Sequence, residues 1–162
     1  MKININTMRC KECHEEMTLR PLEPMAGEEH GVRMRIEGMP VMQCPNGHKR
    51  FVAPDFAVKM MQALLTDEPL VPLDAASQKG LLHKRYCCPN CGQELEDGKA
   101  STVETTRALR LEPLDAFGVR VEMPKIRCHG CGRESVPPEK VMADDLMKAS
   151  ANAFRSAAVS PI

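Results

Sequence analysis

Large aromatic side chains are nearly absent from this sequence. Among its 162 residues there are four Phe, one Tyr and no Trp, so aromatic residues make up 3% of the chain. This scarcity excludes a core built from large rings, and it disfavours a row of aromatic side chains for stacking nucleic-acid bases. Other sources of stability are therefore needed.

The sequence also lacks a net charge. Its 22 basic residues balance 22 acidic ones, with nine against eight in residues 1–66 and thirteen against fourteen in residues 67–162. A nucleic-acid-binding domain usually carries a basic surplus on one face. The short basic clusters at 83–85 and at Arg107 and Arg110 fit solvated surface. We therefore rank nucleic acid below protein as a partner.

Long apolar runs are missing as well. No window approaches the ~20 apolar residues that span a bilayer, and the first six residues have no apolar run of the kind found in secretory signals. We therefore expect a cytoplasmic protein with no membrane partner. In that reducing compartment, closely paired cysteines are expected to bind metal rather than form disulfides.

What the sequence does have is a metal-ligand pattern that occurs twice. Two ligands spaced Cys-x-x-Cys are followed after thirty residues by a Cys and a His in the first set, and after thirty-six by a second Cys-x-x-Cys in the other. Four soft ligands in two close pairs suit a tetrahedral zinc ion, so the sequence predicts two structural Zn²⁺ ions. The ligands are Cys10, Cys13, Cys44 and His48 at site 1, and Cys88, Cys91, Cys128 and Cys131 at site 2. Iron is the main competing metal at the all-cysteine site 2.

The assignment of His48 depends on an internal repeat. Pro54 follows His48 by six residues, and Pro137 follows Cys131 by six, so the two ligands occupy equivalent positions. The eighth cysteine, Cys87, is a reactive or substituting thiol or a small buried residue, and we favour the buried residue. The twelve methionines are scattered rather than arranged in Met-x-x-Met repeats, which favours packing over copper handling.

The repeat also indicates the local structure. Apolar and charged residues alternate over 32–37 and over 119–121, which predicts antiparallel strands between the ligand pairs. Helices are predicted from Pro54–Asp55 to Leu65 and from Pro138–Glu139 to Ser156. We expect a small metal-bound α+β fold of two tandem zinc ribbons, each an antiparallel β-sheet followed by a helix. The predicted boundaries are 1–66 for the first ribbon, 67–85 for a linker and 86–162 for the second ribbon.

The second predicted helix is longer than its ribbon needs. Its apolar strip includes Met142, Leu146, Ala149 and Ala153 and continues to Phe154. Such a surface must contact the first ribbon, a second copy or a different protein. We expect a second copy or a different protein.

Each half resembles the YgiT-type zinc-finger domain, the zinc-binding part of MqsA-like antitoxins. The resemblance lies in the order of a Cys-x-x-Cys pair, a long excursion of strands, a second ligand pair and a helix. In that family the zinc domain holds a toxin partner, while a separate helix-turn-helix domain binds DNA. This chain has His48 in place of a cysteine, a second ribbon and no recognisable helix-turn-helix. The resemblance therefore implies protein binding and does not imply DNA binding.

Catalysis finds little support in the sequence. Both ligand sets are complete, whereas a catalytic zinc keeps one open position. We therefore expect a non-enzymatic, zinc-binding protein-interaction module or regulatory adaptor. The second choice is a nucleic-acid-associated transcriptional regulator. The third is a metal-delivery protein, which closed sites disfavour because they release metal poorly.

Overall fold

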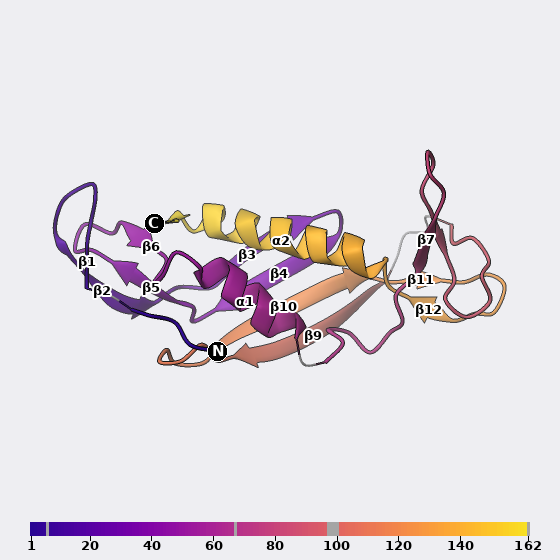
Figure 1. Cartoon of the computed structure of the whole chain (residues 1–162), viewed down its shortest axis with the longest axis horizontal. Helices are drawn as coiled ribbons and strands as arrows, with labels where there is room; N and C mark the ends of the chain where they lie inside the picture. Colours follow the sequence, from indigo (N-terminus) through magenta and orange to yellow (C-terminus); the bar gives the residue numbers. More distant parts are fainter. Residues whose placement is uncertain (6, 67, 97–100, 162) are drawn as a thin grey trace.

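The computed structural model is a small α+β fold and describes residues 1–5, 7–66, 68–96 and 101–161 (Figure 1). The helices are α1 (Phe56–Leu65) and α2 (Glu139–Ser156), and both were predicted from the sequence. The strands are β1 (Met8–Arg9), β2 (Glu16–Pro21), β3 (Met25–Glu29), β4 (Val32–Glu37), β5 (Pro40–Gln43), β6 (Lys49–Arg50), β7 (Ser77–Lys79), β8 (Arg85–Cys87), β9 (Thr102–Leu109), β10 (Phe117–Pro124), β11 (Ile126–Arg127), β12 (Glu134–Ser135) and β13 (Val159–Ser160).

The centre of the molecule is an antiparallel sheet to which both halves contribute. Its order is β3-β4-β10-β9, and the halves meet where β4 pairs with β10, with Met34 opposite Val121. Each half supplies a hairpin, β3–β4 or β9–β10. The predicted antiparallel strands are confirmed, and the repeated hairpins lie edge to edge in one sheet.

The alternation of side chains gives this central sheet one apolar and one charged face. On β4, Val32, Met34 and Ile36 are buried, and the arginines and the glutamate between them are exposed. Strand β10 buries its side chains with the same period of two. Figure 1 shows α1 and α2 lying over the central sheet, so the apolar face and the two helices enclose the main core.

Each helix packs on the hairpin of the other half. Helix α1 lies along β9, where the Arg107 guanidinium donates hydrogen bonds to the carbonyl oxygens of Leu64 at 2.9 Å and Pro69 at 2.7 Å. Helix α2 lies along β3, where the Asn152 Nδ2 donates to the carbonyl oxygen of Glu28 at 2.7 Å. The two halves therefore exchange helices, as in a domain-swapped pair joined into one chain.

The segment after each helix continues this exchange. After α2, strand β13 pairs in parallel with β6 of the first half. After α1, Ala75 forms a parallel bridge with Val136 of the second half, and the Ala76 amide donates to the Val136 carbonyl at 2.8 Å. Each of these pairings therefore involves a segment that follows a predicted zinc site in the chain: β6 follows site 1, and Val136 follows site 2.

The apolar strip of α2 is covered by the chain itself. Leu146, Ala149, Ala153 and Phe154 are buried, and the backbone of Ala149 and Ala153 lies directly against Gly27 of β3. Our expectation that this strip faces a partner is therefore wrong. Strand β3 of the first half covers the strip instead. The helix can approach this strand so closely because Gly27 has no Cβ.

The predicted linker takes part in this structure. Val71 is buried in the main core, and β7 lies within the segment, whereas residue 67 lies outside the described residues. The main core takes residues from both sides of the segment. The boundaries of the two ribbons remain a prediction.

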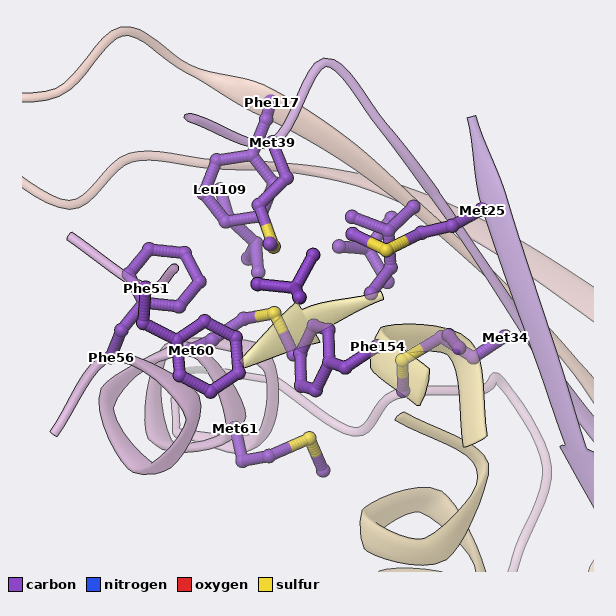
Figure 2. Packing of buried hydrophobic residues seen from close by; sticks show 14 of the residues in the cluster. Met25, Met34, Met39, Phe51, Phe56, Met60, Met61, Leu109, Phe117 and Phe154 are labelled. Carbon is purple, nitrogen blue, oxygen red and sulfur yellow. The ribbon is translucent and has the colours of Figure 1, made fainter. Parts of the chain in front are cut away.

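The main core is rich in methionine and has few rings, as Figure 2 shows. Phe154 of α2 meets Phe51 of the first half edge to face, with ring centroids 4.9 Å apart. The ring centroids of Phe56 in α1 and Phe117 in β10 are 6.0 Å apart. The sequence predicts seven methionines in a core or interface, of which Met34, Met39, Met42, Met60 and Met61 are buried, Met142 is partly buried and Met147 is 58% exposed. A smaller cluster of Ala76, Cys88, Leu95 and Cys128 lies apart from this core.

Candidate metal centres

The eight predicted ligands gather into two clusters. Within each cluster the four ligand atoms all lie within 4.8 Å of one another. The clusters lie at opposite ends of the molecule, site 1 beside β1, β2, β5 and β6 and site 2 beside β8, β11 and β12 (Figure 1). These groups can bind metal ions.

The distances within each cluster fit a tetrahedron of zinc ligands. With zinc–sulfur bonds of ~2.3 Å and zinc–nitrogen bonds of ~2.0 Å, a tetrahedron has edges of about 3.8 Å between sulfurs and about 3.5 Å between sulfur and nitrogen. At site 2 the Sγ atoms of Cys88 and Cys131 are 3.6 Å apart, and those of Cys91 and Cys128 are 3.5 Å apart. These edges are compatible with a tetrahedral metal ion held by four thiolates.

Site 1 has the same shape with one nitrogen corner. The Cys13 and Cys44 Sγ atoms are 3.6 Å apart. His48 directs Nδ1 into the cluster, 3.4 Å from the Cys10 Sγ and 3.3 Å from the Cys44 Sγ. The imidazole therefore occupies the fourth corner through a defined ring nitrogen.

Three of the four ligand pairs share one backbone turn. In each, the amide of the first cysteine donates to the carbonyl five residues later, and the amide four residues later donates back to the cysteine carbonyl, at distances of 2.8–2.9 Å. The residue four positions on has a positive φ in all three, which favours glycine at Gly92 and Gly132. His14 takes that position at site 1 with φ 64°. Its role next to Cys13 is therefore that of a turn residue.

The turn at Cys44 is one residue shorter. The Cys44 amide donates to the His48 carbonyl at 3.1 Å, and Gly47 supplies the positive φ with its amide 3.0 Å from the Cys44 carbonyl. The chain thus returns to the cluster at position 48, where the longer imidazole reaches the corner. This geometry accounts for the three-residue gap that distinguishes the pair from Cys-x-x-Cys.

A carboxylate that was not among the predicted site residues supports His48. The Glu12 Oε2 lies 2.9 Å from the His48 Nε2, on the ring edge that faces away from the cluster. Donation of the Nε2–H to Glu12 leaves Nδ1 with a free lone pair, as metal-binding histidines require. Glu12 lies between Cys10 and Cys13, and a carboxylate inside a ligand loop is the sequence signal that could have identified it.

Backbone amides favour the thiolate form of several ligands. A hydrogen bond from the Arg133 amide lowers the pKa of Cys131 to about 6. A hydrogen bond from the Glu15 amide lowers the pKa of Cys13, and one from the Cys131 amide lowers the pKa of Cys128. In the same clusters, burial raises the pKa of Cys44, and despite a hydrogen bond from the Gln93 amide, contacts with the neighbouring thiols raise the pKa of Cys91 to about 11. The thiolate is the metal-binding form, so the backbone amides favour it at some ligands and not at others.

The remaining candidates lie outside the clusters. Cys87 is buried, as we favoured. Its backbone forms an isolated antiparallel β-bridge with Glu94 next to site 2. His129 directs its Nε2 toward the exposed Glu96 at 3.7 Å rather than into the cluster. None of the described helices is long and apolar enough to cross a membrane.

All four donors of each cluster come from the protein, so an ion bound to them has no free position for water or substrate. This arrangement is typical of structural metal sites.

Comparison of the chain with protein-family models, with curated proteins and with solved structures finds no match.

Proposed function

We propose that this protein is a non-enzymatic interaction adaptor built from two zinc ribbons, each with one structural Zn²⁺. The observation that carries the proposal is the fit of both clusters to closed tetrahedra of zinc ligands. Structural zinc contributes on the order of 10–16 kcal/mol to the folding of small zinc-binding peptides. Here it would stabilise the two ends of a molecule whose aromatic content is 3%.

The candidate partner surface is a groove between the two helices. It has a volume of about 660 Å³ and lies between the outer sides of α1 and α2, where Arg155 is the charged lining residue. Val58 and Met147 are each 58% exposed there, and Leu65 is 41% exposed. Helix α1 contains a single charged residue, Lys59, and a helix apolar on all sides is normally covered.

An amphipathic helix of a protein partner is the occupant that we propose for this groove. Two neighbouring helices offer a channel into which the apolar side of a third can pack. Arg155 lies in the last turn of α2, so an acidic residue on the incoming helix would complement it. The resemblance to YgiT-type domains, which hold a protein partner, supports the same class. A second copy of the chain is the competing occupant.

The charges on the outer face of the central sheet weigh against nucleic acid. The arginines on this face are paired within the chain: Arg33 with Glu28 at 3.1 Å, Arg35 with Glu37 at 2.7 Å and Arg120 with Glu104 at 2.7 Å. Neutralised arginines offer little to a phosphate backbone. Closed metal sites weigh against metal delivery.

The test places a charge in the groove. Val58→Asp and Met147→Asp alter exposed positions, so both variants should keep their zinc and fold. Wild-type protein, used as bait in its native cell extract, should retain a partner that both variants lose. Self-association of purified wild type that both variants abolish would identify a second copy as the occupant. Capture that is unchanged in both variants would show that the groove is not the interface.

A further inference from the structure

The hairpin between β7 and β8 projects from the site 2 end of the molecule (Figure 1). The two strands pair from Ser77–Cys87 to Lys79–Arg85, and residues 80–84 form the tip. Gly80 has φ +100° and lies against the backbone of His83, so it is the residue that closes the turn.

Two leucines occupy this tip and contact almost nothing. Leu81 is 99% exposed and Leu82 is 92% exposed, whereas the other exposed large hydrophobic residues within the described part of the chain lie between 41% and 58%. Turns favour Gly, Asn, Asp, Pro and Ser, and leucine has no conformational advantage there. The fold therefore gives no reason for two adjacent leucines at this position.

The residues that flank the leucines are basic. Lys79 and Arg85 form the last pair of the strands, His83 and Lys84 lie between them, and residues 77–87 contain no carboxylate. Arg85 has an ion pair with Glu94 at 3.5 Å, which leaves Lys79 and Lys84 as the cations beside the tip without a salt bridge among the described residues. Apolar side chains at the extreme end with cations behind them form an amphipathic projection.

We propose that this tip docks on an anionic membrane surface, with Leu81 and Leu82 inserted at the boundary of head groups and acyl chains. A projecting pair of residues cannot supply the ~800 Å² that each partner buries in a standard protein interface. A bilayer surface requires no complementary shape, and anionic head groups attract lysines close to the surface. The sequence predicts no membrane partner because it lacks a spanning segment, but surface docking does not need one.

The chemistry predicts weak and reversible binding. Burial of a leucine side chain contributes about tenfold or more to partition, so the two together contribute on the order of 100-fold. Each lysine near the surface contributes about fivefold on anionic lipid. The two leucines and two lysines together contribute about 3000-fold to partition on anionic lipid, so binding weaker than the ~10⁴ M⁻¹ of a single acyl anchor is expected.

The test is co-sedimentation of the zinc-loaded full chain with vesicles. Wild-type protein should bind vesicles of phosphatidylcholine and phosphatidylglycerol in equal parts, and high salt should weaken that binding. The double variant Leu81→Ser with Leu82→Ser should lose about 100-fold in partition. Lys79→Gln with Lys84→Gln should lose about 30-fold on these vesicles and nothing on pure phosphatidylcholine.

Leu19→Ser on β2 is the matched control, since it removes an exposed apolar side chain away from both the tip and the helix groove and should bind like the wild type. Zinc content and circular dichroism should be identical in all the variants, because the tip side chains lie outside the core. Absence of wild-type binding at tens of millimolar lipid, or equal binding by the leucine double variant, overturns the proposal. Neither result would bear on the helix groove, which the Val58 and Met147 variants test separately.

Discussion

The Glu12 carboxylate lies 2.9 Å from the Nε2 of His48, while the Nδ1 of the same ring lies 3.3 Å from the Cys44 Sγ. One imidazole therefore joins the cluster of ligand atoms to a carboxylate on the same turn as Cys10 and Cys13. Such a carboxylate fixes the histidine tautomer and raises the basicity of the ligand nitrogen. Site 1 thus has a carboxylate that orients one of its ligands. The four cysteines of site 2 have no second ring nitrogen to which such a carboxylate could bind.

Glu12→Gln should weaken zinc binding at site 1 by about 10- to 100-fold and leave site 2 unchanged. The amide still accepts a hydrogen bond, but it lacks the charge that favours the metal-bound imidazole. Competition with a chromophoric chelator would resolve the two sites. Glu96→Gln is the control, because Glu96 lies near His129, which is outside the cluster. Equal affinities in wild type and Glu12→Gln would show that Glu12 has no part in the site.

His48→Ala should release one zinc ion per chain, whereas His48→Cys should keep both. The alanine variant leaves three thiols and an open corner, and the cysteine variant restores four donors. Native mass spectrometry would count the ions directly. If His48→Ala retained two tightly bound ions, another group, such as the neighbouring His14, would complete site 1.

The sequence predicted the local structure well because its determinants are local. Ligand spacing identified both clusters, and alternation identified β4. Proline punctuation and apolar periodicity gave α1 and α2 their bounds. Even the unusual ligand His48 followed from its distance to Pro54. The strands, the helices and each close pair of ligands depend on residues that are neighbours in the chain, and the internal repeat related the distant pairs.

The exchange of helices was not predictable in the same way. Because the halves are repeats, the apolar strip of α2 is compatible with the hairpin of either half, and periodicity cannot distinguish the two. The choice depends on the pairing of β4 with β10 and on contacts such as Asn152 with Glu28, which join residues far apart in the chain. Glu12 was missed for a related reason, since its partner His48 comes near it only after folding.

Gly27→Ala should destabilise the protein by about 1–3 kcal/mol or more, because the new Cβ would meet the backbone of Ala149 and Ala153 in α2. Gly118→Ala in β10 is the control, because a Cβ there would meet nothing within 4 Å. Its free energy of unfolding should stay within about 0.5 kcal/mol of the wild-type value. Urea unfolding of the zinc-loaded proteins would measure both. Equal stabilities would mean that α2 does not lie on β3.

Stability should depend on pH through His30. Its Nδ1 lies 3.0 Å from the buried Asp145 of α2, and this hydrogen bond and charge raise the pKa of His30 above its usual value of 6.5. A raised histidine pKa stabilises the fold fully below pH 6.5, and the contribution is lost as the pH rises through the higher folded-state pKa.

Wild type should therefore exceed His30→Gln in stability by more at about pH 6 than at about pH 8. Thermal unfolding of both proteins at each pH would test this, and the comparison cancels effects of pH on the metal sites that the two proteins share. A constant difference across that range would exclude the pair as a titrating contact.

The most direct test of the account is the zinc content of the purified, folded chain. Two closed clusters of ligand atoms with tetrahedral spacing predict two zinc equivalents per chain by elemental analysis, and removal by a chelator should unfold both ends of the molecule. A zinc content near zero in protein that is still folded would contradict the account.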